Sequence, residues 1–216
     1  MLQAAGWSGS LSQDAHRLPW LVDGVARHCA ESGPSELAAA ARQRRDESAD
    51  VQTARLLAYW SGGRPASHDY LSRALLRPYL EVLRAQGVAL DRSERHGICP
   101  FCGGHPWVAA RREGSLMEGA RRMLVCGACG LEWLFQRIVC PACGETDPAK
   151  LPAFRDDRFP AIRLEACETC RRYVKSIDLS EDARPIPEVD DLVSLALDLW
   201  AVEQGFTRIE PGLAGL

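Results

Sequence analysis

The N-terminal part of the chain carries hydrophobic residues at three- and four-residue spacing, which is the period of an amphipathic helix. This pattern predicts short helical pieces within residues 1–33, an alanine-rich helix over 35–45, a helix over 49–60 and a longer one over 69–86. The apolar face that we expect on the helix over 49–60 consists of Val51, Ala54, Leu57 and Ala58. The pattern therefore predicts an all-helical N-terminal domain, to which we assign residues 1–95.

The pattern changes beyond this domain. Short runs of strand-forming residues, such as 122–125 and 131–135, alternate with Cys-Pro and Gly turns. Strands of this length are marginal on their own, so we expect an additional staple to hold them. We assign residues 96–136 to a first small module and residues 137–180 to a second.

The last segment, residues 181–216, is predicted to be a linker, a helix and a tail. A proline-containing linker over 184–187 precedes a helical pattern that Asp190 or Asp191 can cap and that Gly205 ends. The apolar face that we expect to be buried consists of Leu192, Leu195, Ala196, Leu199 and Val202. We expect the tail after Thr207 to be irregular.

The cysteines are the sequence feature that indicates the chemistry of this protein most directly. Eight of the nine cysteines form four C-x-x-C pairs, and the second two pairs repeat the first two at an offset of 41 residues. The pairs are Cys99/Cys102, Cys126/Cys129, Cys140/Cys143 and Cys167/Cys170. A tandem repeat of this kind predicts two copies of one small metal-binding unit. In a chain without a secretory signal, such pairs indicate metal ligands or redox groups rather than structural disulfides.

Two ligand pairings are compatible with the spacing. The pairing that we favour keeps each site within one repeat. It gives a first site of Cys99, Cys102, Cys126 and Cys129 and a second site of Cys140, Cys143, Cys167 and Cys170. The alternative is an interleaved pairing in which the two central pairs share one ion. Zinc and iron both accept four thiolates in a tetrahedron, so either ion fits the pattern.

Composition and charge limit the function. An apolar content of 46% and a charged content of 25% are typical of a soluble globular protein. No apolar run approaches the roughly 20 residues of a membrane span, and residues 1–10 lack the features of a secretory signal, so we expect a cytoplasmic protein. Residues 92–176 carry fourteen basic and ten acidic side chains. Two four-thiolate sites on divalent ions carry about −4, so we expect these arginines to offset that charge rather than to bind nucleic acid.

The remaining candidate residues favour structural roles. Cys29 is predicted to be a small buried side chain, and His96 and His105 to be loop residues near the first cysteine turn. We expect the aromatic residues Trp107, Trp133 and Phe135 to pack the thin cores of the modules, with an exposed protein-binding patch as the alternative. The sequence carries no Ser/His/Asp set, paired-carboxylate motif or phosphate-binding glycine loop. We therefore predict that the protein is not an enzyme.

Several of these segments together resemble a known family. Similarity to the formate dehydrogenase accessory protein family, FdhE, is found in the segments over residues 98–103, 122–126, 131–133, 137–140, 166–170, 173–175 and 189–206. The resemblance implies an α+β fold, with a helical N-terminal domain, two tandem rubredoxin-like or zinc-ribbon-like four-cysteine modules and a C-terminal helix. It implies iron as the metal, with zinc as the alternative.

The same resemblance implies a function. Members of this family are expected to be cytoplasmic, non-catalytic proteins that mature respiratory formate dehydrogenase by binding its catalytic subunit. Two other functions remain open on the residues alone. One is an iron-thiolate redox protein that acts on that subunit, and the other is a nucleic-acid-binding zinc ribbon.

Overall fold

The computed structural model of this protein shows two compact units. It describes residues 6–61, 69–88, 90, 96–114, 119–180 and 184–212. The first unit is Met1–Asp91 and the second is Arg92–Leu216. The domain boundaries that the sequence suggests at 95/96 and 180/181 each adjoin a stretch outside the described residues. Among the described residues, no helix combines the length and apolar character that a bilayer crossing requires.

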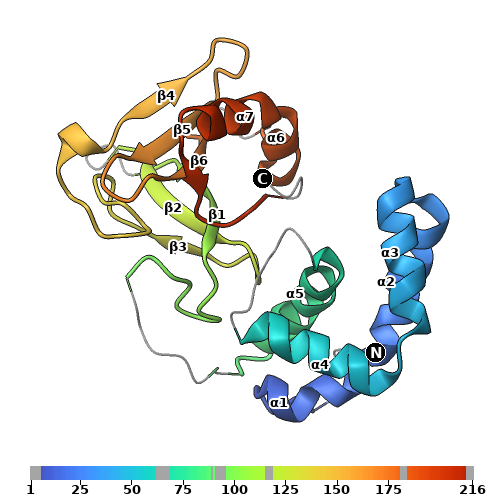
Figure 1. Cartoon of the computed structure of the whole chain (residues 1–216). Helices are drawn as coiled ribbons and strands as arrows, with labels where there is room; N and C mark the ends of the chain where they lie inside the picture. The colour runs from blue at the N-terminus through green and yellow to red at the C-terminus, as the bar shows by residue number, and fades with distance from the viewer. Residues whose placement is uncertain are drawn as a thin grey trace. The chain divides into compact units, whose positions relative to one another are not determined.

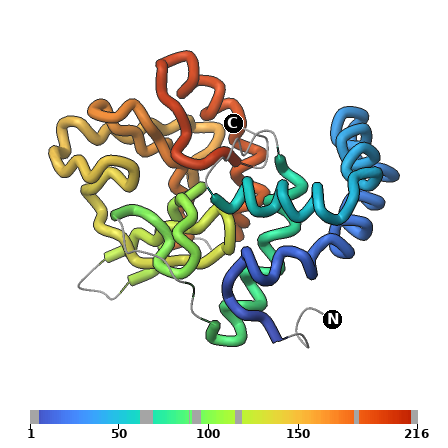
Figure 2. Tube along the Cα trace, turned by 60° about the horizontal axis from the view of Figure 1, so that its bottom comes forward, coloured from blue at the N-terminus to red at the C-terminus, as the bar shows by residue number. Residues whose placement is uncertain are grey.

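The first unit is helical. Its elements are α1 (Leu11–Asp14), the 3-10 helix η2 (Ala15–Arg17), α2 (Pro19–Ser32), α3 (Ser35–Asp46), α4 (Ala49–Trp60) and α5 (Tyr70–Ala85). Figures 1 and 2 both show α2 and α3 side by side. The predicted helices over 35–45, 49–60 and 69–86 are confirmed to within one residue at each end.

Local sequence sets the ends of these helices. The Ser48 hydroxyl accepts a hydrogen bond from the Val51 amide at 3.4 Å, and Asp69 accepts one from the Ser72 amide at 3.0 Å, so α4 and α5 begin with side-chain caps. Gly87 has a φ of 67°, the left-handed conformation that commonly follows a helix. The helix α5 continues through Pro78.

The predicted apolar face of α4 is wrong. The residues that α4 buries are Gln52, Leu56 and Tyr59, whereas Val51 is 45% exposed. Gln52 can be buried because its side-chain amide donates to the carbonyl oxygens of Arg44 and Glu47, each at 3.1 Å. A count of apolar residues along the helix cannot anticipate a polar side chain whose hydrogen bonds are satisfied.

The second unit is built on one mixed sheet. Its strands are β1 (Pro106–Arg112), β2 (Arg121–Cys126), β3 (Glu132–Leu134), β4 (Ala153–Arg155), β5 (Ile162–Cys167), β6 (Arg172–Leu179) and β7 (Thr207–Arg208). Its helices are the 3-10 helix η3 (Pro148–Lys150), α6 (Pro187–Val193) and α7 (Leu195–Glu203). The strand order is β3-β2-β1-β6-β5-β4, and β7 pairs with β6.

The two sequence repeats lie in this sheet as successive copies. The strand β2 covers 121–126 and β5 covers 162–167, so the 41-residue offset is also the offset between equivalent strands. Within each repeat neighbouring strands are antiparallel, whereas β1 and β6 join the repeats as a parallel pair. One hydrophobic core consequently serves both repeats; it includes Trp107, Val125, Leu164, Tyr173 and Ile177.

The C-terminal region differs from its prediction in three ways. It contains two helices that meet at Ser194, and the first begins at Pro187 rather than after Asp190 or Asp191. Asp190 instead accepts a hydrogen bond from the Ile186 amide at 2.5 Å, which caps the start of α6. The two-residue strand β7 (Thr207–Arg208) was not predicted, whereas the described residues that follow it, 209–212, have no regular secondary structure, as expected.

The third difference concerns which face of these helices is buried. Of the face predicted to be buried, Leu192, Leu199 and Val202 are exposed. The buried positions include Asp191, Ser194 and Asp198. Ion pairs with β6 and β7 explain this arrangement, because buried carboxylates are stable only when they are paired.

Those ion pairs form a buried cluster. The Lys175 ammonium group lies 2.7 Å from an Asp191 oxygen and 2.6 Å from an Asp198 oxygen. Arg208 contacts the same carboxylates, at 2.6 Å from Asp191 and 3.2 Å from Asp198. Tyr173 donates a hydrogen bond to Asp198 at 2.8 Å, and burial together with the Asp198 charge raises the pKa of this phenol. Two positive and two negative charges thus balance inside the unit.

Candidate metal centres

The structure gathers the eight paired cysteines into two groups. The first contains Cys99, Cys102, Cys126 and Cys129, and the second contains Cys140, Cys143, Cys167 and Cys170. Within each group the four sulfur atoms all lie within 4.8 Å of one another. The grouping follows the repeats, as the favoured pairing does, and differs from the interleaved one. Within the described part of the chain, no other group of three or more His, Cys, Asp or Glu side chains lies close enough together to hold a metal ion.

The sulfur separations fit a tetrahedral metal site. The Sγ–Sγ distances are 3.6 Å for Cys99–Cys129, 3.4 Å for Cys102–Cys126, 3.7 Å for Cys140–Cys170 and 3.7 Å for Cys143–Cys167. Metal–sulfur bonds of about 2.3 Å in a tetrahedron place the sulfurs about 3.8 Å apart. Each group is therefore nearly the size of an occupied four-thiolate site, and two such sites could bind metal ions.

The backbone shapes all four cysteine turns in the same way. In each turn, the amide after the second cysteine donates to the carbonyl oxygen of the first cysteine. These bonds are Gly103–Cys99 at 2.9 Å, Gly130–Cys126 at 3.1 Å, Gly144–Cys140 at 3.0 Å and Arg171–Cys167 at 2.9 Å. In the second turn, the amides of Ala128 and Cys129 also lie 3.4 and 3.5 Å from the Cys126 sulfur. Amides directed at sulfur favour the thiolate form.

The fourth turn reaches this geometry without glycine. Arg171 has a φ of 55° and is the one non-glycine residue with a positive φ among the described residues. Its side chain is fixed outside the site, because the guanidinium group lies 3.8 Å from the centre of the Phe206 ring and pairs with Glu168. Arg171 therefore does not serve as the thiolate counter-charge that the sequence suggested.

Electrostatics indicate that the sulfurs need a cation to ionise together. Hydrogen bonds from the thiols of neighbouring cysteines lower the pKa of Cys99, whereas the hydrogen bond with Cys102 and those with the other two sulfurs raise the pKa of Cys126. In the second site, burial raises the pKa values of Cys140 and Cys170. A bound divalent ion would stabilise all four sulfurs of a site as thiolates, because its charge is larger than that of any nearby side chain.

The two sites differ in exposure. All four cysteines of the first site are buried. In the second site Cys143 is exposed and Cys170 is half-buried, whereas Cys140 and Cys167 are buried. The second site is thus open to solvent along one side.

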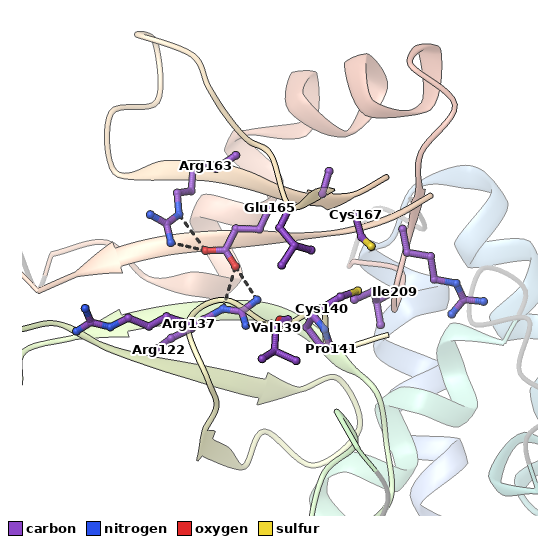
Figure 3. A pocket seen from close by; sticks show the side chains of 13 residues that line it. Arg122, Arg137, Val139, Cys140, Pro141, Arg163, Glu165, Cys167 and Ile209 are labelled. Atoms are coloured by element: carbon purple, nitrogen blue, oxygen red, sulfur yellow. Dashed lines mark hydrogen bonds and ion pairs between the residues drawn. The ribbon is translucent and has the colours of Figure 1, made fainter. Parts of the chain in front are cut away.

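A cavity of about 140 Å³ lies against the second site. Figure 3 shows Cys140 and Cys167 in its wall, with Glu165 held between Arg122 and Arg163 in the same wall. Glu165 lies 2.7 Å from the Arg122 guanidinium and 2.5 Å from that of Arg163. Burial alone would raise the pKa of Glu165, but the charges of the two arginines outweigh it and lower this pKa below its usual value.

The other residues that were singled out from the sequence are not among the eight grouped cysteines. His96 contacts the second site rather than the first, because its Nε2 lies 3.0 Å from the Cys140 carbonyl oxygen. His105 is exposed, and its carbonyl oxygen accepts the Gly127 amide at 3.0 Å. Cys29 is half-buried in α2, so its predicted burial is only partial. Trp107 is buried in the core, as expected, whereas Trp133 is half-buried on β3.

Two residues beside the second site were not singled out from the sequence. Glu145 accepts a hydrogen bond from the Thr169 hydroxyl at 2.5 Å, and this bond, followed by backbone amides, lowers the pKa of Glu145 to about 2. A comparison of the repeats position by position would have found them, since they replace Gly104 and Ala128 of the first repeat.

Comparisons with known proteins agree with this architecture. The family model described as the C-terminal domain of FdhE matches residues 138–213. A curated FdhE homologue of Aquifex aeolicus is 38% identical over 117 residues, which cover 54% of this chain and 41% of that protein. A homologue of Pseudomonas aeruginosa is 31% identical over 210 residues, which cover 91% of this chain and 66% of that protein. The matches therefore span less than two thirds of the length of these relatives.

The fold agrees with a solved structure as well. The crystal structure of the FdhE protein from Pseudomonas aeruginosa superimposes with a TM-score of 0.73 and 26% identity, over 94% of this chain and 73% of that one. The sequence match to the Pseudomonas aeruginosa homologue covers 91% of this chain and the structural match 94%, so both extend over both units. The chain is therefore similar to FdhE proteins over most of its length.

Proposed function

We propose that this protein is a non-catalytic accessory protein that matures respiratory formate dehydrogenase by binding its catalytic subunit. The observation that carries the proposal is the pair of four-cysteine groups in a chain similar to FdhE proteins. A site that uses four protein ligands leaves no open position for a substrate, so such sites typically stabilise a fold rather than catalyse hydrolysis. The metal would hold short strands in place and present their surfaces to a partner.

An exposed apolar surface supports a partner-binding role. Six large hydrophobic residues of the C-terminal region are exposed, and we call them the C-terminal apolar strip: Ile186, Val189, Leu192, Val193, Leu199 and Val202. Exposed apolar groups gathered in this way often mark protein–protein contacts. We assign this strip to the catalytic subunit of formate dehydrogenase because the similarity to FdhE proteins supplies that partner.

A co-purification experiment tests this function. Metal-replete protein, tagged and prepared without oxygen, is mixed with the catalytic subunit, which should be retained by the wild-type protein. A Val193→Asp/Leu199→Asp variant should retain much less of it. A Val51→Asp variant, changed at an exposed valine of α4, serves as the matched control and should behave as the wild type does. Absence of retention by the folded, metal-loaded wild-type protein would contradict the proposal.

A redox function is the second candidate, and the openness of the second site favours it. Exposure of Cys143 and half-exposure of Cys170 would bring an iron ion close to the surface, where a partner can exchange electrons with it. Iron bound by four thiolates is coloured and redox-active, whereas zinc is neither. Elemental analysis and visible absorption of anaerobically purified protein distinguish the two, and a colourless protein that contains only zinc would exclude the redox function.

Nucleic-acid binding is not part of the proposal. The arginines that would support it lie on β1 and β2, and three of them are engaged with carboxylates. Arg111 lies 3.5 Å from Asp178, Arg112 lies 2.6 Å from Glu132, and Arg122 lies 2.7 Å from Glu165. Phosphate contacts need basic side chains whose charge is available, so these pairs support the protein-binding role instead.

A further inference from the structure

The sulfurs of the first site are covered by small residues. A Cβ atom added to Gly104 would lie 2.9 Å from the Cys126 sulfur, 3.3 Å from the Cys102 sulfur and 3.2 Å from the Ala128 side chain. The backbone at Gly104 therefore packs directly on the site, and the buried Ala128 side chain lies beside it. Solvent is excluded from these sulfurs because nothing larger than glycine fits in that place.

The second site has polar side chains at the equivalent positions. At the 41-residue offset, Gly104 corresponds to Glu145 and Ala128 corresponds to Thr169. These two side chains bond to each other at 2.5 Å across the cysteine turns. We call Glu145 and Thr169 the polar rim of the second site. A carboxylate and a hydroxyl group hold water and attract cations, whereas glycine and alanine do neither.

Two further differences at the cysteine turns follow the same trend. Gly127 corresponds to Glu168, and Gly130 corresponds to Arg171. Glu168 and Arg171 form an ion pair at the fourth turn. The second repeat thus replaces four small residues with two ion-pairing and two hydrogen-bonding side chains. All four residues lie in or next to the turns that carry Cys143 and Cys170, the less buried cysteines of the site.

The cavity of about 140 Å³ also borders the second site. Its wall includes Cys140 and Cys167, the two buried cysteines of that site. The second site is therefore reached by solvent past the polar rim and bordered by a cavity on its buried side. The first site differs, because its four cysteines are all buried and none of them lines this cavity.

From these differences we propose that the two sites divide the work: the first is a permanent structural staple, and the second exchanges its metal ion past the polar rim. The inference requires that both sites bind metal, but it does not depend on the identity of the partner protein. During exchange, the donor atoms of an incoming ligand replace Cys143 and Cys170 first and the two buried cysteines afterwards. The ion leaves with the incoming ligand and the freed thiolates take up protons from water, so no oxidant or reductant is required.

Metal release to a chelator tests the proposal. Protein loaded with two equivalents of zinc is mixed with an excess of a chromogenic chelator, and release is followed by absorbance. We expect two phases of equal amplitude. The rate constant of the faster phase should be at least about tenfold larger than that of the slower phase. Iodoacetamide added after the fast phase, followed by mass spectrometry, should label the cysteines of the second site and leave those of the first unlabelled. Release in one phase, or labelling of the first site before the second, would overturn the proposal.

Exchanging the rim residues for those of the first repeat tests the cause. A Thr169→Ala variant, and a Glu145→Gly/Thr169→Ala variant, should slow the fast phase by about tenfold while leaving the slow phase unchanged. The matched control is Asp156→Asn, which removes a half-buried carboxylate of the same unit that pairs with Arg158. Fast phases that are identical in all three variants would show that the rim does not govern exchange and would overturn that part of the proposal. If the wild-type protein fails to retain the catalytic subunit but releases its metal in the two expected phases, the proposed function alone is contradicted.

Discussion

The ammonium group of Lys175 on β6 lies 2.6 Å from a carboxylate oxygen of Asp198 on α7, and neither side chain has any exposed surface. The pair connects the C-terminal helices to the sheet. A buried ion pair contributes little to stability compared with apolar packing, but loss of one partner leaves an uncompensated charge in a dry interior. Lys175 and Asp198 should therefore tolerate single substitutions poorly.

Replacing Asp198 is the first test. An Asp198→Ala variant should lose about 3–5 kcal/mol of the free energy of unfolding of the second unit. Lys175 would keep only Asp191 as a carboxylate partner, and Tyr173 would lose the acceptor of its hydrogen bond. Urea denaturation of the metal-loaded protein measures the change. An Arg158→Ala variant, which removes an exposed ion pair with Asp156, is the control and should unfold as the wild type does. Equal stability of the two variants would contradict the argument.

The same cluster explains why the C-terminal helices were predicted only in part. The spacing of Leu192, Leu199 and Val202 indicates a helix, and helices are present. Periodicity assigns their buried face to the apolar residues, but Lys175 and Arg208 arrive from strands distant in sequence and draw the aspartates inward instead. A single sequence shows the charges but not which of them meet.

The cysteine turns were the part best predicted from sequence. Their spacing acts locally, since each C-x-x-C turn is shaped by its own backbone hydrogen bond, and the 41-residue offset carries over to β2 and β5. The joining of the two repeats through the parallel pair β1–β6 was not predicted, because nothing in either repeat specifies its neighbour in the sheet. The polar rim of Glu145 and Thr169 is recognised only when the two repeats are aligned position by position.

The stability of the helical unit should depend on pH through the hydrogen bond between Asp14 and Tyr79. The Tyr79 hydroxyl donates to Asp14 at 2.7 Å. Burial alone would raise the pKa of Asp14, but this bond, followed by amide bonds from Ser8 and Gly9, lowers it below its usual value. A carboxyl group with a lowered folded-state pKa stabilises the fold above its unfolded pKa of about 3.9 and loses this contribution as the pH falls through the folded value.

A Tyr79→Phe variant should therefore be less stable than the wild type by about 1–2 kcal/mol at pH 7. The difference should shrink as the pH is lowered below about 4, because Asp14 becomes protonated in both proteins. Urea denaturation followed by circular dichroism at several pH values measures both effects. A stability difference that stays constant from pH 7 to pH 3 would show that the hydrogen bond to Asp14 is not its source.

Loss of one ligand should affect one repeat strongly. A Cys102→Ser variant should bind one metal ion less and unfold the first repeat, because structural zinc in small units contributes about 10 kcal/mol or more of folding free energy. The matched control is Cys29→Ser, since Cys29 lies in α2 of the helical unit and outside both groups. Elemental analysis and thermal denaturation provide the measurements. Unchanged metal content in Cys102→Ser would contradict the assignment of the first site.

The positive φ of Arg171 gives a test of the fourth turn. At this position glycine is free of the steric cost of about 1–2 kcal/mol that a side chain incurs in the left-handed region. Both Arg171→Gly and Arg171→Ala lose the contact with Phe206 and the ion pair with Glu168, so their difference isolates the backbone cost. We expect Arg171→Gly to be the more stable of the two by about 1 kcal/mol in thermal denaturation. Equal stability would mean that the turn does not hold residue 171 at a positive φ.

Gly104 offers the sharpest test of the closed first site. A Gly104→Ala variant places a methyl group 2.9 Å from the Cys126 sulfur, which is closer than a carbon and a sulfur atom can approach. Either the sulfur or the backbone must move, so the four sulfurs lose their tetrahedral spacing and the variant should release the metal of the first site faster than the wild type does. Gly24→Ala, where an added methyl group meets nothing within 4 Å in the helix α2, is the control and should raise the stability of the helical unit by about 0.5–1 kcal/mol. If the slow phase of metal release is the same in Gly104→Ala and the wild type, the backbone at Gly104 does not seal the site.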